Sequence, residues 1–112
     1  MKTIKWSHSI LFIIINCYLV SVASASKICT LEGKWAGFTM HSRASDSPKQ
    51  MVLKLADMTY PRSEYPAMNR RSKEITEEIY QWSSSKLNRY KPFKKNQLIK
   101  VEDDFEVACR NR

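Results

Sequence analysis

Two cysteines, Cys29 and Cys109, constrain this chain more than any other feature, because no other cysteine lies between them. A disulfide between them would close a ring of 109 − 29 = 80 residues. In the chain-entropy model, such a loop stabilises a fold by about 4 to 5 kcal/mol. Domains of this size bury only about 60 to 65% of their unfolded surface, so a core alone supplies little net stability. We expect a fold that depends on this bridge; the alternative is two free, buried thiols.

Residues 1–25 have the pattern of a secretory signal peptide. Two lysines among the first five residues precede an apolar run over residues 10–22, and Ala23-Ser24-Ala25 supplies the small residues that signal peptidase accepts. Cleavage there would leave residues 26–112 as one secreted domain in an oxidising compartment, where cysteine pairing is the default. The apolar run is too short to span a membrane and no second run follows. We therefore expect no membrane partner after cleavage.

Charge is the next constraint, because residues 26–112 carry 17 Lys and Arg against 11 Asp and Glu. The net charge of +6 fits phosphate-bearing or acidic partners, and it also fits a soluble secreted protein with no such partner. Basic residues cluster at Arg70-Arg71 with Lys73 and again between Lys86 and Lys95, whereas acidic residues gather between Glu102 and Glu106. These clusters indicate either a binding patch or solvated loops.

Metal and hydrolase chemistry have little support in the sequence. His41 is the one histidine after the leader, no Cys or His spacing resembles a zinc site, and both remaining thiols are expected in the bridge. We expect neither a metal nor a cofactor, and no serine or cysteine nucleophile.

One helix and several strands are predicted along the domain. The clearest signal is a helix over residues 48–58, where Pro48 fits the first turn and Val52 and Leu55 recur at helical spacing. Residues 28–31 and 34–41 are typical of two short strands joined at Glu32-Gly33.

The second half of the domain is harder to assign. Residues 60–69 indicate a tyrosine-rich loop or edge strand, and residues 72–82 fit either a helix or, over 78–82, a strand. Residues 98–102 and 105–109 alternate in polarity around Asp103-Asp104, which predicts an antiparallel hairpin.

This order of elements resembles the small guanyl-specific ribonucleases of fungi and, more closely, the ribonuclease-like effectors that cereal powdery mildews secrete. The motifs that carry the resemblance are Tyr60-Pro61-Arg62 with the nearby Tyr65, then Tyr80-Gln81-Trp82, and an aromatic, Phe105, shortly before Cys109. The resemblance favours a strand over residues 78–82. It implies an α+β fold in which one helix packs on a curved antiparallel sheet closed by the Cys29–Cys109 disulfide.

The same comparison implies that the chain is not an enzyme. In the ribonucleases a glutamate stands where this chain has Gln81, and a histidine stands where it has Arg62. General acid and base catalysis needs groups that exchange a proton near the working pH, and neither residue does so. The segment from Cys29 to Trp35 is also similar to the first strand of avidins and lipocalins, but an eight-stranded barrel needs a longer chain.

The resemblance implies a secreted fungal virulence effector that acts by binding, either to a host plant protein such as an immune receptor or to RNA, outside the host cell or after translocation into it. The alternatives are an active secreted ribonuclease and a small secreted toxin or ligand. We expect a monomer. The predicted core positions are Trp35, Val52, Leu55, Ile79, Trp82, Ile99 and Val107. The predicted binding surface, where aromatic residues alternate with bases, comprises Tyr60, Arg62, Tyr65, Arg70, Arg71, Gln81 and Arg89.

Overall fold

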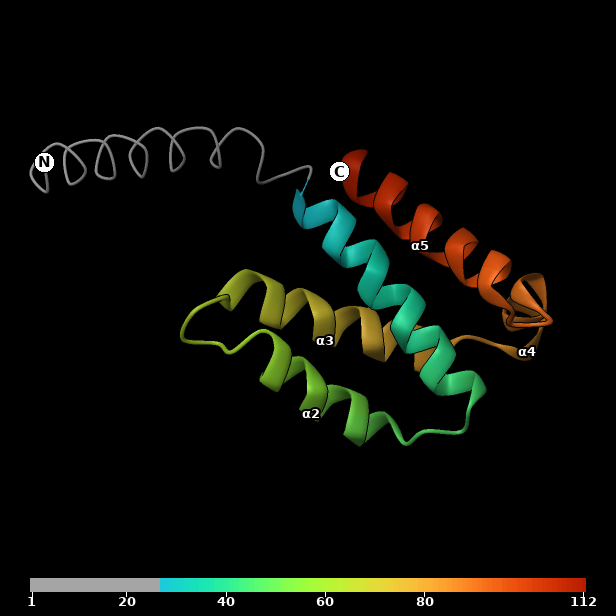
Figure 1. Ribbon diagram of the computed structural model, residues 1–112, viewed down its shortest axis with the longest axis horizontal. Coiled ribbons are helices and arrows are strands. Elements are labelled where there is room, and N and C mark those ends of the chain that lie inside the picture. Colours follow the sequence, from blue (N-terminus) through green and yellow to red (C-terminus); the bar gives the residue numbers. More distant parts are fainter. Residues whose placement is uncertain (1–26) are drawn as a thin grey trace, which may run out of the picture.

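The computed structural model describes residues 27–112, and this part of the chain is helical (Figure 1). The first helix covers residues 27–44 and is followed by α2 (Lys49–Thr59) and α3 (Pro66–Gln81). A single turn, α4 (Ser84–Leu87), and the 3-10 helix η1 (Asn88–Tyr90) lead to α5 (Lys95–Arg110). No strand occurs between residues 27 and 112, so the expected α+β class with an antiparallel sheet is wrong. The predicted leader lies outside the described residues.

Helix 27–44 is the central element, and it replaces the two strands predicted over residues 28–31 and 34–41. Most of its buried side chains recur at the spacing of one helix face, and the buried side chains are Cys29, Glu32, Trp35, Ala36, Thr39, Met40 and Ser42. This face packs on α3, where the Trp35 Nε1 donates a hydrogen bond to the Thr76 Oγ1 at 3.0 Å. The apolar residues of this segment therefore follow the spacing of a helix and not the alternation of a strand. Glu32-Gly33 lies within the helix instead of forming a turn.

Helix 27–44 ends in a turn whose N–H groups donate hydrogen bonds to carbonyl groups of the last helical turn. Asp46 adopts a left-handed φ of 60°, its N–H bonds to the Arg43 carbonyl at 3.0 Å, and the Ser47 N–H bonds to the Ser42 carbonyl at 2.9 Å. This pair of bonds is the Schellman arrangement, in which glycine is the usual left-handed residue. Arg43 reaches across to the end of α3 and donates to the carbonyls of Ile79 and Trp82.

Helices α2 and α3 lie side by side and antiparallel (Figure 1). The helix predicted over residues 48–58 is confirmed as α2, with Pro48 at its N-cap. Its buried residues, Val52 and Ala56, recur at helical spacing and belong to the same core as those of α3.

Helix α3 begins with Pro66 at its first position, where the missing proline N–H has no cost. Ile75 and Ile79 are fully buried. The strand predicted over residues 78–82 is wrong, because these residues form the last turn and C-cap of α3. The Tyr80 hydroxyl donates to the Ser47 carbonyl at 2.6 Å, which ties this turn to the start of the α2 segment.

Helix α5 runs through both strands of the hairpin predicted over residues 98–109, so that hairpin is also wrong. Val101 and Phe105 are buried one helical turn apart, while the expected turn residues Asp103 and Asp104 lie exposed on the same helix.

Four of the seven predicted core residues are buried, namely Trp35, Val52, Ile79 and Trp82. Leu55 is half-buried against the core. Ile99 and Val107 are exposed by 42% and 55% and were wrongly placed in the core, because strand alternation selects a different face from helical spacing.

Two glycines allow helix 27–44 and α5 to approach closely. A Cβ at Gly33 would lie 2.6 Å from the backbone oxygen of Glu102, and one at Gly37 would lie 2.7 Å from the Cγ of the same residue. Real Cβ atoms do not approach other atoms this closely. The four-residue spacing of the two glycines places both on one side of helix 27–44, so α5 packs directly against its backbone.

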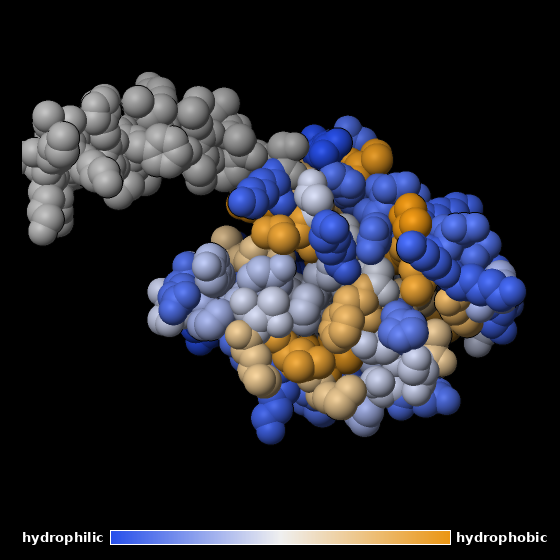
Figure 2. All heavy atoms as spheres, viewed as in Figure 1, coloured by the Kyte–Doolittle hydropathy of each residue, from blue (hydrophilic) through white to orange (hydrophobic). Residues whose placement is uncertain are grey.

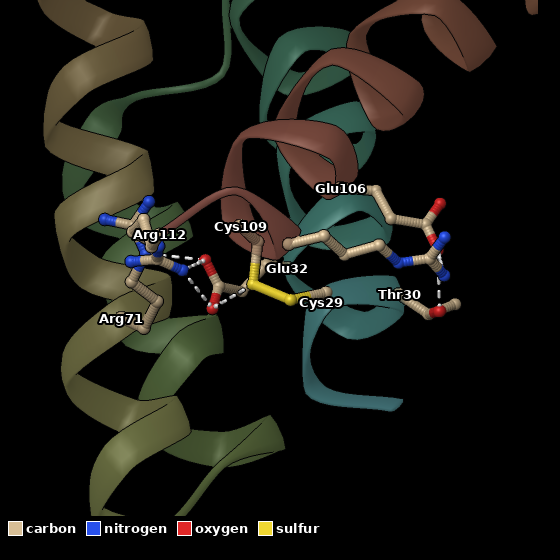
Figure 3. Close-up of a disulfide and its surroundings, with 8 residues drawn as sticks. Cys29, Thr30, Glu32, Arg71, Glu106, Cys109 and Arg112 are labelled. Atoms are coloured by element: carbon tan, nitrogen blue, oxygen red, sulfur yellow. Dashed lines mark hydrogen bonds and ion pairs between the residues drawn. A yellow bond between two sulfur atoms is a disulfide. The ribbon is translucent and has the colours of Figure 1, made fainter. Parts of the chain in front are cut away.

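The Cys29–Cys109 disulfide is confirmed, and it joins the start of helix 27–44 to the end of α5 (Figure 3). Beside it lies Glu32, which is only 3% exposed. The Glu32 carboxylate accepts from the Arg71 Nε at 2.6 Å and from the Arg112 guanidinium at 2.8 Å (Figure 3). A buried carboxylate is costly unless it is paired, and here two arginines from different parts of the chain supply the pairing.

The structure also removes the scaffold that the ribonuclease resemblance implied. Tyr80-Gln81-Trp82 lies at the end of α3 and Phe105 lies in the middle of α5, so neither stands on a central strand. The positions of Gln81 and Arg62 therefore do not correspond to a catalytic pair on a sheet. Among residues 27–112, no helix is both long and apolar enough to cross a membrane.

Candidate binding surface

A groove of about 960 Å³ lies along the outer face of α3. Pro66, Arg70, Lys73 and Glu77 succeed one another at helical spacing along it, because the opposite face of α3 is committed to the core. The complete lining comprises Arg62, Pro66, Asn69, Arg70, Lys73, Glu74, Glu77, Glu78, Gln81, Trp82 and Lys86. We call this feature the α3 groove.

Ion pairs with α2 hold one wall of the α3 groove. The Lys73 Nζ lies 2.6 Å from the Asp57 Oδ1, and the Lys49 Nζ lies 3.0 Å from the Glu77 Oε2. The hydrogen bond from Lys73, together with one from Asn69, lowers the pKa of Asp57 below its ordinary value. These contacts link α2 to the groove side chains Lys73 and Glu77. Both pairs are partly exposed, so each contributes little to stability.

The α3 groove carries both signs of charge. Its cations are Arg62, Arg70, Lys73 and Lys86, and its carboxylates are Glu74, Glu77 and Glu78. Arg70 is largely exposed and lies 3.8 Å from Glu74, one turn further along α3. The three carboxylates would repel a phosphate backbone, whereas a protein surface can match both signs.

A row of aromatic rings lies beside the first turn of α3. The ring of Trp35 is 5.2 Å from that of Phe38 and 6.0 Å from that of Tyr60, whose ring is in turn 6.2 Å from that of Tyr65. Burial raises the pKa of Tyr60. Phe38 and Tyr65, at the two ends of this row, are 39% and 51% exposed. The aromatic row thus connects the core to two accessible rings, which is typical of protein-binding surfaces.

The other end of the α3 groove is formed by Trp82. Its ring stacks on Tyr90 with the centroids 5.7 Å apart, and the Lys86 Nζ lies 4.5 Å above it. The Trp82 Nε1 is buried and has no hydrogen-bond partner among the described residues. Burial, followed by a hydrogen bond from its own hydroxyl to Asp104, raises the pKa of Tyr90 to about 12.

The structure divides the seven predicted surface residues into separate groups. Tyr60, Arg62, Tyr65 and Arg70 gather at the α2–α3 connection and the first turns of α3. Gln81 lies at the far end of the same helix and also lines the α3 groove.

The remaining two predicted residues belong elsewhere. Arg71 is turned toward Glu32 and lies 2.6 Å from it, so this arginine stabilises the disulfide region instead of facing the groove. Arg89 lies in η1, away from the α2–α3 connection. The predicted binding surface omitted Glu74, Glu77 and Glu78, and it omitted Lys73 although Lys73 belongs to the basic cluster with Arg70 and Arg71. These side chains become neighbours only once residues 66–81 are assigned to a helix.

Among residues 27–112, no three His, Cys, Asp or Glu side chains lie close enough together to hold a metal ion. The chain matches no protein-family model, no curated protein and no solved structure.

Proposed function

We propose that this chain is a secreted binding protein, without catalytic activity, that holds a protein partner in the α3 groove. The observation that carries the proposal is an open groove that presents both signs of charge, with its Lys73 and Glu77 paired to residues of α2. Tyr65 is half exposed at the N-cap of α3, between Arg62 and Arg70 in the sequence, and adds an accessible ring of the kind that protein interfaces use as an anchor.

Secretion is supported by the signal-peptide pattern of residues 1–25 and by the disulfide, a bond that persists in oxidising compartments. The class of partner, a host plant protein such as an immune receptor, is carried over from the short motifs Tyr60-Pro61-Arg62 and Tyr80-Gln81-Trp82 alone, because the order of elements that accompanied them is not that of the structure. The ribonuclease scaffold forms no part of the proposal.

The test is capture of plant proteins by the disulfide-bonded protein and by two charge-reversed variants. Arg62→Glu with Arg70→Glu changes the α3 groove, whereas Lys34→Glu with Lys54→Glu makes the same change in net charge at exposed positions outside it. The proposal expects a protein that the original chain and the control variant both retain and the groove variant loses. Equal capture by all three chains would contradict it.

RNA is the alternative partner, and a direct measurement separates it from a protein. We expect no detectable affinity of the α3 groove for single-stranded RNA, because its carboxylates oppose phosphate. Salt-dependent RNA binding that is lost in Arg62→Glu with Arg70→Glu would replace the protein partner by a nucleic acid.

A further inference from the structure

The net charge of the described chain is concentrated in one segment. Residues 83–101, here called the basic segment, contain no Asp or Glu. Their six cations are Lys86, Arg89, Lys91, Lys94, Lys95 and Lys100. The rest of residues 27–112 contains 11 basic and 11 acidic residues, so the whole excess of +6 belongs to this segment. Such segregation creates a local field that a uniform distribution of the same charges would not.

The cations of the basic segment do not stabilise the fold through ion pairs. Every salt bridge found between residues 27 and 112 uses cations from outside the segment. Lys94 is the N-cap of α5, Lys95 is its first residue, and the first turn contains no acidic residue. Cations at a helix N-terminus oppose the helix dipole and lower helix stability. This placement is unfavourable within the isolated chain, and an anionic partner would relieve it.

The position of the basic segment suits contact with a large surface. It forms the end of the molecule opposite the disulfide, where α4, η1 and the start of α5 meet (Figure 1). Hydrophilic side chains cover most of this end, with apolar ones between them (Figure 2). Ile99 is 42% exposed and lies on α5 near Lys95 and Lys100. A partner at this end therefore meets cations and an accessible aliphatic side chain together.

The aromatic residues of the segment do not suit RNA. Single-stranded RNA is held by stacking on accessible rings and by arginine forks. Tyr90 is 6% exposed, with its ring stacked on Trp82 and its hydroxyl bonded to Asp104. Phe93, the other aromatic residue of the segment, is partly buried against the core. Five of the six cations are lysines, which act as point charges. Lysine clusters beside an accessible aliphatic residue are typical of contacts with anionic lipid.

We propose that the basic segment binds the surface of a membrane that contains anionic phospholipid, with Ile99 entering the interface. This contact is peripheral, it departs from the expectation of no membrane partner, and it shares only Lys86 with the α3 groove. Neutralising one lysine near an anionic surface is expected to lower affinity about five-fold. Lys94→Gln with Lys95→Gln should therefore weaken binding about 25-fold.

The experiment is co-sedimentation of the disulfide-bonded protein with vesicles of phosphatidylcholine alone or of phosphatidylcholine mixed with phosphatidylserine. We expect binding only to the mixed vesicles, and we expect it to weaken with salt. Lys34→Gln with Lys54→Gln is the matched control and should bind as the original chain does. Ile99→Ser should lower the binding that remains at high salt. Circular dichroism and a thermal melt establish that each variant is folded.

Three results would overturn the proposal. They are equal binding to both kinds of vesicle, an equal loss in the control variant, and RNA binding that depends on Lys94 and Lys95 without vesicle binding. The groove variant Arg62→Glu with Arg70→Glu keeps this test distinct from that of the proposed function. It should lose binding to the protein partner and retain binding to the mixed vesicles.

Discussion

The two ends of α5 differ in whether the charges beside them are paired. At its C-terminal end Glu32 is buried between Arg71 and Arg112, beside the disulfide. At its N-terminal end the lysines gather against the helix dipole, and no acidic residue lies among them. Paired and buried charges fix a structure, whereas unpaired like charges weaken it. We infer that the disulfide end maintains the fold and that the basic end serves an interaction.

Removing the disulfide should have the largest effect on stability. Cys29→Ser with Cys109→Ser opens a loop of 80 residues, which is expected to lower the free energy of unfolding by about 4 to 5 kcal/mol. Urea titration followed by far-ultraviolet circular dichroism measures the change, and the reduced original chain is the control. A loss below about 1 kcal/mol would show that the disulfide end does not maintain the fold.

Glu32→Gln should have the next largest effect. The substitution keeps the shape of the side chain but removes the carboxylate that pairs with Arg112 and leaves Arg71 paired only with Glu74, at an expected cost of about 2 kcal/mol. This is below the cost for fully buried pairs, because both arginines reach solvent. Glu64→Gln, at an exposed position, is the matched control. Equal stability of the two variants in urea would contradict the account.

Alanine substitutions at the two glycines of helix 27–44 should differ in their effect on stability. Gly33→Ala places a Cβ against the backbone of α5 and should cost about 1 kcal/mol after the gain in helix propensity. Gly37→Ala meets only the flexible side chain of Glu102, so the gain should balance or exceed the strain. Thermal melts of the two variants should therefore differ in sign or size. Equal destabilisation would mean that the close approach to α5 is not as described.

The smallest expected effect is at the end of helix 27–44. Asp46 has a φ of 60°, which glycine adopts without strain. Asp46→Gly should therefore stabilise the protein by about 0.5 to 1 kcal/mol. Asp46→Ala serves as the control, because alanine is strained at this φ as well. A melting temperature for Asp46→Gly at or below that of Asp46→Ala would exclude the left-handed turn.

The disulfide and α2 could be predicted from the sequence because their signals are complete within it. The single pair of cysteines that follows the predicted leader permits one bridge, and Pro48 followed by apolar residues at helical spacing marks a helix start. Helix 27–44 could not be predicted in this way. Gly33 has the appearance of a turn residue, and its role as a contact with α5 exists only in the folded molecule.

Residues 72–82 fit both a helix and a strand, and the resemblance to ribonucleases favoured the wrong one. The helix buries Ser72 and Thr76 with their hydroxyls bonded to carbonyls of α3, and Thr76 also accepts from Trp35. Polar residues such as these are usually expected to be exposed. The sequence therefore did not indicate which face of α3 packs against helix 27–44.

The candidate surface was predicted in part for the same reason. Arg70 and Arg71 are neighbours in sequence, but successive residues of a helix are rotated by about 100° about its axis. Arg70 therefore lines the α3 groove, whereas Arg71 points to Glu32. Only the rotation of α3 about its axis decides which arginine is free to bind, and the sequence alone does not set that rotation.

The most direct test of the division between the two ends is a crossed measurement on Glu32→Gln and on Lys94→Gln with Lys95→Gln. Both chains are compared with the original in urea unfolding and in binding to phosphatidylserine-containing vesicles. The account predicts that Glu32→Gln loses stability and keeps its vesicle affinity, and that the lysine variant loses affinity while its stability is unchanged or slightly raised. Loss of stability and affinity together in both variants would contradict the division.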